Sequence, residues 1–361
     1  MSAVCDGRGG GPRVSTHHYL GHAVTATAVA VECRQMADAD VLYVSPHADD
    51  VAFSAAGQLA RDVAAGDRVT LLTLFDPAHE DGPKSFSDRA ARRAEDEAFA
   101  RAFGVTLERA PFADAIVRRR RYRSPQRLFA PLRADEAPLV DEVRALLQAH
   151  VDRGCARVVA PLGVGGHVDH QIAHRASSFL RGSSVRYYED TPYVLTPYQL
   201  PRRLARLDAE VVGARDATLE RGTVRAELGA AASSWMSAPL LQDRLGPRLR
   251  KLAVATILTP EWTRWPRRSR TGARRFAAEL LEAAEPPAVA EPPAFAELPA
   301  FAELRHLVDV KLRAIACYSS QWPLFYRTLD EWRDALAAYG RRMGRAGVVE
   351  RSWCEVTPAA P

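Results

Sequence analysis

Two short segments of this chain combine histidine with aspartate at spacings that suit a metal ion. The first is 45–50, which runs Ser-Pro-His-Ala-Asp-Asp. His47 and Asp50 are three residues apart across a tight turn, so an imidazole nitrogen and a carboxylate oxygen can converge on one ion, with Asp49 beside them. The alternative is that both aspartates only cap the helix that follows, a position that aspartate favours. The segment alone leaves both interpretations open.

The second segment is 167–170, His-Val-Asp-His, much later in the chain. His167 and His170 share one face at the start of a predicted helix, and Asp169 can orient an imidazole through a hydrogen bond. Alone, such a run is more often a surface or capping feature. Together with the first segment it supplies two histidines and one carboxylate with open positions, and this combination predicts a metal site.

Both segments follow predicted strands. Val41–Val44 is a short apolar run typical of a strand buried on both faces, and it ends directly before the first segment. Ala156–Ala160 has the same character and leads into the glycine-rich loop Pro161–Gly166 and then the second segment. Because ligands of open α/β sheets bind at the carboxyl ends of the strands, the two loops can meet there.

The elements around these strands alternate between helix and strand. Helices are predicted at about Val51–Ala65, Asp88–Phe103, Leu139–Arg153 and Asp169–Arg181, and further strands at about Arg68–Phe75, Val105–Leu107 and Val185–Tyr188. This alternation predicts an α/β fold with a Rossmann-like, mostly parallel sheet flanked by helices.

The two ends of the chain lack this alternation. Residues 1–36 show no periodicity and are interpreted as an N-terminal extension, with 37–361 as a single domain. An Arg-rich helical insertion is expected at 201–304. It includes a low-complexity loop at 285–304, in which Glu-Pro-Pro-Ala recurs. Helical patterns return between 305 and 342, so the C-terminal part is expected to fold back onto the sheet.

Composition indicates a globular protein rather than a membrane or nucleic-acid-binding protein. The chain has 361 residues, 47% of them hydrophobic, which is enough for a large core. Its cysteines number five, an odd count without Cys-x-x-Cys spacing, which argues against disulfides and thiolate zinc. The net charge of +5 is spread along the chain, so no nucleic-acid partner is expected. No signal peptide or membrane span is indicated, and a cytoplasmic location is predicted.

The chain resembles the LmbE-like or PIG-L deacetylases, a family that includes the N-acetylglucosaminyl-phosphatidylinositol and mycothiol-pathway deacetylases. The resemblance covers most of 40–195 and resumes later. It rests on the two segments and on Val41, Arg92, Glu95, Gly104, Asp114, Lys311-Leu312-Arg313-Ala314 and Tyr318-Ser319-Ser320-Gln321. It implies a LmbE-like fold, a zinc ion and hydrolysis of an N-acyl amide.

The resemblance also implies roles for the residues of both segments. His47, Asp50 and His170 match the metal ligands, and Asp49 matches the general base. His167 matches the residue that polarises the carbonyl or protonates the leaving amine. The chemistry agrees, because an ion with three protein ligands lowers the pKa of water towards roughly 7. A cationic His167 is then expected to stabilise the tetrahedral oxyanion.

Two positions depart from parts of the family. Members often have Glu after the paired aspartates, where this chain has Val51. Mycothiol-type members have a tyrosine two residues before the first histidine of the second segment, where this chain has Gly165. A tyrosine that helps to stabilise the oxyanion would therefore come from Tyr187, Tyr188 or Tyr193, or be absent. The mycothiol precursor is not the expected substrate.

Four more polar residues are candidates for substrate binding: Arg92, Asp114, Glu189 and Asp190. Arg92 is at helical spacing from Glu95, so an internal ion pair is its alternative. A cap or turn is the alternative for Glu189 and Asp190, which end a predicted strand. Asp114 is a candidate partner for sugar hydroxyls.

Two basic features have simpler structural explanations. His174 lies one turn after His170 and is expected to pack rather than bind the ion. The run 118–123, Arg-Arg-Arg-Arg-Tyr-Arg, is interpreted as a solvated or disordered loop. It could also close over the sheet edge and bind a substrate phosphate or carboxylate, or hold RNA.

Together these patterns predict a zinc-dependent N-deacetylase. Its substrate would be an amino-sugar-containing small molecule, in bacterial secondary metabolism such as antibiotic biosynthesis. Another divalent transition metal is the alternative to zinc. Two alternative functions remain: an amidase on a thiol conjugate or peptide-like amide, and a metal-less protein that binds RNA or an acidic partner through 118–123. The sequence does not indicate an oligomeric state.

Overall fold

A computed structural model describes residues 39–76, 89–212, 216–232, 274–282 and 306–356, and the structural statements below concern these residues. The N-terminal extension predicted at 1–36 and the low-complexity loop predicted at 285–304 lie outside them.

The centre of the fold is a strand that is buried on both faces. In β1 (Asp40–Ser45) the run from Val41 to Val44 is at most 2% exposed, as its unbroken apolar sequence predicts. β1 lies inside an eight-stranded sheet of order β3-β2-β1-β4-β5-β8-β7-β6. The other strands are β2 (Arg68–Asp76), β3 (Thr106–Ala113), β4 (Arg157–Pro161), β5 (Ser184–Tyr188), β6 (Ala209–Val212), β7 (Arg274–Glu282) and β8 (Val349–Glu355).

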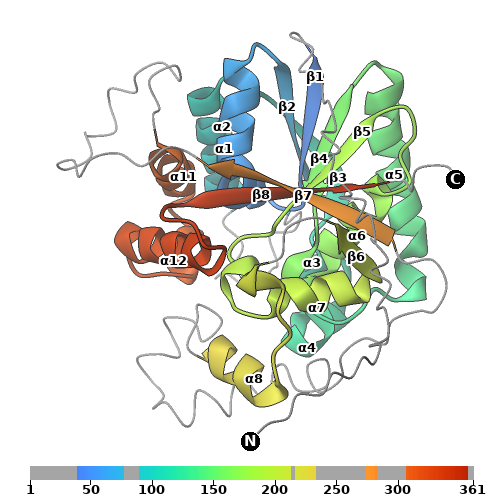
Figure 1. The fold of residues 1–361 in the computed structure, drawn as a ribbon. Helices are drawn as coiled ribbons and strands as arrows, with labels where there is room; N and C mark the ends of the chain where they lie inside the picture. Colours follow the sequence, from blue (N-terminus) through green and yellow to red (C-terminus); the bar gives the residue numbers. More distant parts are fainter. Residues whose placement is uncertain (1–38, 77–88, 213–215, 233–273, 283–305, 357–361) are drawn as a thin grey trace, which may run out of the picture. The chain divides into compact units, whose positions relative to one another are not determined.

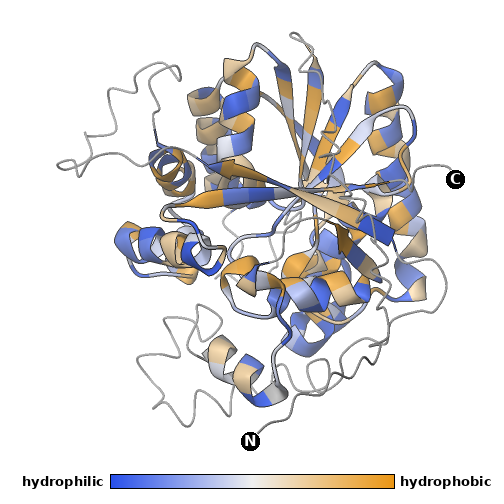
Figure 2. Cartoon of the chain, in the orientation of Figure 1, coloured by the Kyte–Doolittle hydropathy of each residue, from blue (hydrophilic) through white to orange (hydrophobic). Residues whose placement is uncertain are grey.

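Helices cover both faces of the parallel half of the sheet. α1 (Asp50–Ala64) and α2 (Arg89–Phe103) lie on one side, and α5 (Ala137–Asp152) and α6 (Val168–Ser177) on the other (Figure 1). Figure 2 shows hydrophilic and hydrophobic residues mixed along these helices, as expected for helices with one side against a sheet. The remaining helices are α3 (Ala115–Arg118), α4 (Pro125–Leu128), α7 (Gln199–Arg206), α8 (Val224–Ala232), α11 (Leu307–Ala316) and α12 (Leu329–Arg342).

The predicted α/β fold is confirmed. β3, β2, β1, β4 and β5 pair in parallel, and β8 is antiparallel to both of its neighbours, β5 and β7. The return of the C-terminal part to the sheet is confirmed as well, because α11 packs on α1 and β8 enters the sheet. No helix in the described part of the chain is long and apolar enough to span a membrane.

The insertion predicted as helical after residue 200 contains strands as well as the helices α7 and α8. β6 and β7 lie within it, and they pair in parallel with each other. The sequence of β7, Arg-Arg-Phe-Ala-Ala-Glu-Leu-Leu-Glu, is rich in helix-favouring residues, and only Phe276 in it is fully buried. Pairing with β8 along its length makes it a strand, which is a tertiary effect that local propensity does not show.

The sheet order reverses between β1 and β4. The chain moves outward from β1 through β2 to β3, then returns to place β4 on the other side of β1. A crevice for ligands forms at such a point in open α/β sheets, outside the carboxyl ends of the strands. The loops that follow β1 and β4 are the two segments singled out above.

Candidate metal centre

The loop after β1 does not use its two aspartates as ordinary helix caps. The hydroxyl of Ser45 donates to the carbonyl of His47 and accepts from the backbone N–H of Val51 at 3.2 Å, which closes the turn. The backbone N–H of His47 donates to Oδ2 of Asp50 at 2.7 Å. Asp49 stands at the N-cap position without a side-chain capping bond. The side chain of Asp50 therefore folds back onto the backbone of the loop, at His47.

The loop after β4 needs glycine to reach α6. Gly163, Gly165 and Gly166 have φ of +82°, +83° and +80°, a left-handed conformation that other residues rarely adopt. The loop ends on His167, the N-cap of α6, whose Nδ1 accepts from the backbone N–H of Asp169 at 3.3 Å. Because Nδ1 is the acceptor, the hydrogen of a neutral His167 ring lies on Nε2.

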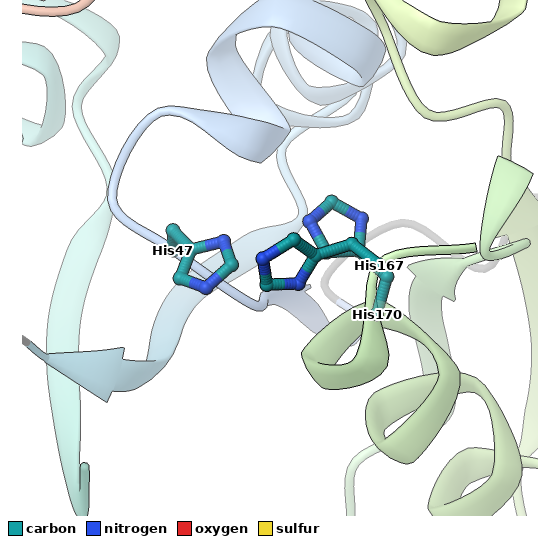
Figure 3. Close-up of side chains that lie close together, drawn as sticks. All are labelled: His47, His167 and His170. Carbon is teal, nitrogen blue, oxygen red and sulfur yellow. The ribbon is translucent and has the colours of Figure 1, made fainter. Parts of the chain in front are cut away.

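The two loops bring His47, His167 and His170 close together (Figure 3). Two of these rings contact one carboxylate oxygen. Oδ2 of Asp50 lies 3.1 Å from Nδ1 of His47 and 3.2 Å from Nε2 of His170. The ring centroids of His47 and His170 are 5.3 Å apart, and the ring of His167 lies 4.9 Å and 5.2 Å from them. One nitrogen from each histidine lies within 4.8 Å of the other two. We call His47, Asp50 and His170 the central triad.

Each imidazole of the central triad contacts a second, outer carboxylate through its other nitrogen. Nε2 of His47 lies 3.2 Å from Oδ2 of Asp169, and Nδ1 of His170 lies 2.6 Å from Oδ1 of Asp190. A carboxylate in this position fixes the orientation and tautomer of a metal-binding histidine. Asp169 thus lies where the sequence predicted an orienting group.

Asp190 does not lie where a substrate-binding residue should. It is 1% exposed, and its Oδ2 accepts from two backbone N–H groups, of Gly163 and Val164, both at 2.7 Å. Its other oxygen is taken by His170. The predicted contact with substrate is therefore wrong for Asp190, and its position is that of an orienting group.

The electrostatics of the central triad favour a cation. Burial alone would lower the pKa values of His47 and His170. The surrounding aspartates outweigh burial, and they raise the pKa of His47 well above its usual value and the pKa of His170 to about 9. Asp50 shifts the opposite way: burial opposes ionisation, but His170 and His47 hold its pKa below the usual range. Without an ion, protons balance this negative charge, and a metal would displace them.

The residues present fit a divalent transition metal. Two imidazole nitrogens and a carboxylate oxygen are donors that zinc and similar ions accept, and they leave open positions for water or substrate. The far nitrogens are held by carboxylates, as in known metal sites. His47, Asp114 and Asp169 form a second group with ligand atoms within 4.8 Å. Since Asp169 already accepts from Arg118 and the backbone of Ala115, we assign it a supporting role.

Comparison with known proteins identifies the segment that carries this centre. Residues 42–179 match the family model of PIG-L, described as GlcNAc-PI de-N-acetylase. The match covers 138 of the 361 residues, and both histidine–aspartate segments lie within it. The family resemblance predicted from the two segments is thereby confirmed.

Individual proteins resemble the chain to different extents. The 2'-N-acetylparomamine deacetylase of Streptomyces fradiae is 37% identical over 164 residues, which cover 42% of this chain and 57% of that protein. The match thus spans little more than half of that relative.

Solved structures extend the likeness beyond the PIG-L segment. The zinc-inhibited form of a teicoplanin deacetylase has a TM-score of 0.52 at 19% identity, and a deacetylase–teicoplanin complex has 0.53 at 18%. Each comparison covers 89% of this chain and 100% of the solved chain. At such low identity they establish a shared fold.

Arg92, which lies within the matched residues 42–179, contacts Asp49, the aspartate outside the central triad. Nη2 of Arg92 lies 3.5 Å from Oδ1 of Asp49, and both residues are 8% exposed. The alternative ion pair with Glu95 is wrong, because Glu95 accepts from Ser319 Oγ at 3.0 Å and from the backbone N–H and Oγ of Ser320, both at 2.7 Å. Arg92 therefore stays a candidate for substrate binding.

Asp114 lies beside His47, at the end of β3. Its Oδ1 caps α3 by accepting from the backbone N–H of Ile116 at 3.0 Å, and its Oδ2 is 3.6 Å from Nε2 of His47. Burial raises the pKa of Asp114, and the charge of His47 opposes that rise. Its predicted contact with sugar hydroxyls stays a prediction.

Glu189 belongs to a buried hydrogen-bond network that does not include the central triad. It accepts from Nε of Arg351 at 2.6 Å, from Nε1 of Trp353 at 2.8 Å and from the hydroxyl of Tyr339, and it is 4% exposed. Both carboxylate oxygens are therefore used to join β5 to β8 and α12. The predicted substrate-binding role of Glu189 is wrong.

The arginine run is only partly solvated: Arg119, Arg120 and Arg123 are exposed, whereas Arg118 and Arg121 are half-buried and paired. Arg118 donates to Oδ1 of Asp169 at 2.8 Å, which places it behind the carboxylate that contacts His47. Arg121 pairs with Asp135 at 2.6 Å and with Glu136 at 2.7 Å. The acidic pair Asp135-Glu136 was the sequence signal for the pairing of Arg121. Arg118 and Arg121 are therefore occupied by carboxylates of the protein itself.

Of the three candidate tyrosines, Tyr193 is the one whose ring packs against the central triad. The ring of Tyr187 lies 4.6 Å from that of His174, tilted by 47°, and Tyr188 donates to the carbonyl of Val44 at 3.0 Å. The ring of Tyr193 lies 5.7 Å from that of His170, edge to face. A Cβ at Gly165 would lie 2.3 Å from Cδ1 of Tyr193, so this ring fills the space of a side chain at 165.

His174 packs, as predicted. It is 2% exposed, and its Nδ1 lies 3.1 Å from the carbonyl oxygen of Pro161. Burial lowers its pKa well below the usual value. The ring is therefore neutral, and it donates to the end of β4 instead of joining the central triad.

Proposed function

We propose that this protein is a metal-dependent N-deacetylase that acts on an amino-sugar-containing small molecule. The observation that carries the proposal is Oδ2 of Asp50, which lies against nitrogens of both His47 and His170, each held from behind by a carboxylate. The PIG-L match and the deacetylase relatives support amide hydrolysis as the reaction.

The central triad would hold the ion. His47, Asp50 and His170 are the proposed ligands, and Asp169 and Asp190 keep the two rings in place. We propose zinc, because imidazole and carboxylate donors suit it. When bound, such an ion supplies Lewis acidity, which makes water easier to deprotonate and a carbonyl group easier to attack.

Asp49 is the proposed proton carrier. Burial and the charge of Asp50 raise its pKa, while the nearby Arg92 opposes the rise. A higher pKa makes the carboxylate a better proton acceptor. Asp49 takes a proton from the attacking water as the new C–O bond forms. It returns that proton to the amide nitrogen as the C–N bond breaks, so that acetate and a free amine leave.

His167 is the proposed hydrogen-bond donor to the carbonyl oxygen. Burial, together with the neighbouring charge of His47, lowers its pKa well below the usual value. The lowered pKa favours a neutral ring, so we propose a neutral donor in place of the cationic His167 expected from the sequence. Because the backbone N–H of Asp169 occupies Nδ1, the hydrogen on Nε2 is the one available to the developing oxyanion.

The proposed substrate class follows from the relatives and from the polar rim of the centre. One relative is named for 2'-N-acetylparomamine, and two solved structures are named for teicoplanin. We propose an N-acetylated sugar on a small molecule of bacterial secondary metabolism. Arg92 and Asp114 are the proposed contacts for its hydroxyl groups, since both lie beside the site residues.

Removal of the metal tests the proposal directly. The purified protein is expected to hold a stoichiometric divalent ion, and a chelator should abolish acetate release from N-acetylated amino sugars. Readdition should be tried with zinc, cobalt and manganese separately, because one solved relative is a zinc-inhibited form. N-acetyl peptides and thiol conjugates serve as comparison substrates. Undiminished acetate release from the metal-free protein would refute the proposal.

Asp190→Asn is expected to weaken metal binding about 10- to 100-fold, because the amide cannot hold Nδ1 of His170 as the carboxylate does. The measurement is a competition titration with a chelator of known affinity. Glu189→Gln is the matched control, since the neighbouring Glu189 is also buried but contacts Arg351 and Trp353. It should lower the melting temperature and leave metal affinity unchanged. Equal metal affinity in both variants would contradict the assigned role of Asp190.

A further inference from the structure

Helix α1 is interrupted one turn after the central triad residue Asp50. Ala55 has φ −131° and ψ 20°, which is not helical. In a regular helix the N–H of Gly57 would donate to the carbonyl of Phe53, and that of Gln58 to the carbonyl of Ser54. A break at Ala55 disturbs these two bonds, so the four buried groups need other partners.

A buried ion pair supplies those partners. Nζ of Lys311 lies 3.0 Å from the carbonyl oxygen of Phe53 and 3.3 Å from that of Ser54. Glu350 accepts from the backbone N–H of Gly57 at 3.0 Å and from that of Gln58 at 2.8 Å. The donors and acceptors of two helical hydrogen bonds are thus taken over by one lysine and one glutamate.

Lys311 and Glu350 also bind each other. Their side chains are 2.8 Å apart, and the residues are 1% and 7% exposed. Lysine is almost never buried this completely unless it is paired. A Cβ at Gly57 would lie 2.1 Å from Leu307 and 3.0 Å from Glu350, so glycine is needed for this close approach. A side chain inserted into the helical ladder is a known cause of a kink.

The short segment before the kink, 50–54, carries a proposed metal ligand at one end and a tether at the other. Asp50 begins it, and Oγ of Ser54 accepts from the backbone N–H of Thr191 at 3.0 Å. Thr191 follows Asp190, which holds His170. The direction of this segment therefore sets the position of Asp50 relative to His170.

We propose that the Lys311–Glu350 pair positions Asp50 for metal binding by holding the kink in α1. The inference rests on the proposed function, because it assumes that Asp50 is a ligand. Lys311 and Glu350 are positioning residues that act through the backbone of 50–54. They lie on α11 and β8, beyond the segment that matches the PIG-L family model, so the C-terminal part of the chain contributes to the centre.

The test measures metal affinity and stability separately in the full chain. Lys311→Met removes the donor to the two carbonyls, and Glu350→Gln removes the charge of its partner. Each variant is expected to bind zinc at least about 10-fold more weakly in chelator competition, at a temperature well below its melting point. If Lys311→Met fails to fold, the zinc affinity of Glu350→Gln alone decides the test.

Asp62→Asn is the matched control. Asp62 lies on the same helix, is 1% exposed, accepts from Tyr43 at 2.6 Å and pairs with Arg157 at 2.9 Å. This variant should also melt at a lower temperature, but with wild-type zinc affinity. Zinc affinity that falls only in the Lys311 and Glu350 variants supports positioning, because a merely stabilising pair would behave like Asp62.

Asp50→Ala separates this inference from the proposed function. If Asp50→Ala loses zinc while Lys311→Met and Glu350→Gln keep wild-type affinity, the positioning role is refuted and the metal site stands. If Asp50→Ala itself keeps zinc, the ligand assignment fails, and the positioning role fails with it.

Discussion

Asp49→Asn is expected to lower turnover by about 100-fold or more while the protein keeps its metal. Asparagine has nearly the same shape, but it cannot accept the proton of the attacking water or return it to the amine. Loss of a positioned general base typically costs 10²- to 10⁴-fold. The measurement is the steady-state rate of acetate release, together with the metal content of the same sample.

The metal content decides how this result is interpreted. Asp49 makes no side-chain capping bond and lies 3.5 Å from Arg92, outside the central triad, so its replacement should leave the ion in place. A variant with normal metal content and normal turnover would rule out Asp49 as the base. A variant without metal would make Asp49 a ligand.

His170→Ala is expected to lose the metal and with it nearly all activity. The change removes a proposed ligand and leaves the buried carboxylate of Asp190 without its imidazole partner. The loss of zinc affinity should exceed the about 100-fold expected for an outer partner. Chelator competition measures the affinity, and acetate release measures the activity.

His174→Asn is the matched control for that change. His174 lies one turn later on α6, is equally buried, and contacts the carbonyl of Pro161 instead of the central triad. Asparagine keeps a donor close to the position of Nδ1, so metal content and turnover should stay near wild type. If both variants lost the metal equally, the general integrity of α6, rather than ligation by His170, would explain the result.

The central triad could be predicted because several independent signals coincide in its two loops. His47 and Asp50 directly follow a fully apolar strand, and His170 follows a second strand and a glycine-rich turn. Parallel strands bring such loops to one edge of the sheet. Residue type, spacing and strand position therefore indicated the same place.

The residues that support the central triad could not be assigned in this way. Asp190 lies after β5, and its role depends on β5 pairing with β4, so that its carboxylate faces His170. Lys311 and Arg118 carry charges that a sequence pattern assigns to solvent, and only the tertiary structure shows their buried partners. Glu189 has a similar local sequence context to Asp190, yet it contacts the opposite neighbour, β8.

The position of β8 has a consequence for the order in which the sheet can be completed. β8 is the last strand in the described part of the chain, but it lies between β5 and β7. While the chain is being synthesised, the edge of β5 that pairs with β8 stays unpaired until about residue 350 has emerged. Until then β6 and β7 are not hydrogen-bonded to the other strands of the sheet. Exposed strand edges of this kind attract other chains. Aggregation during synthesis is therefore the characteristic hazard of this topology.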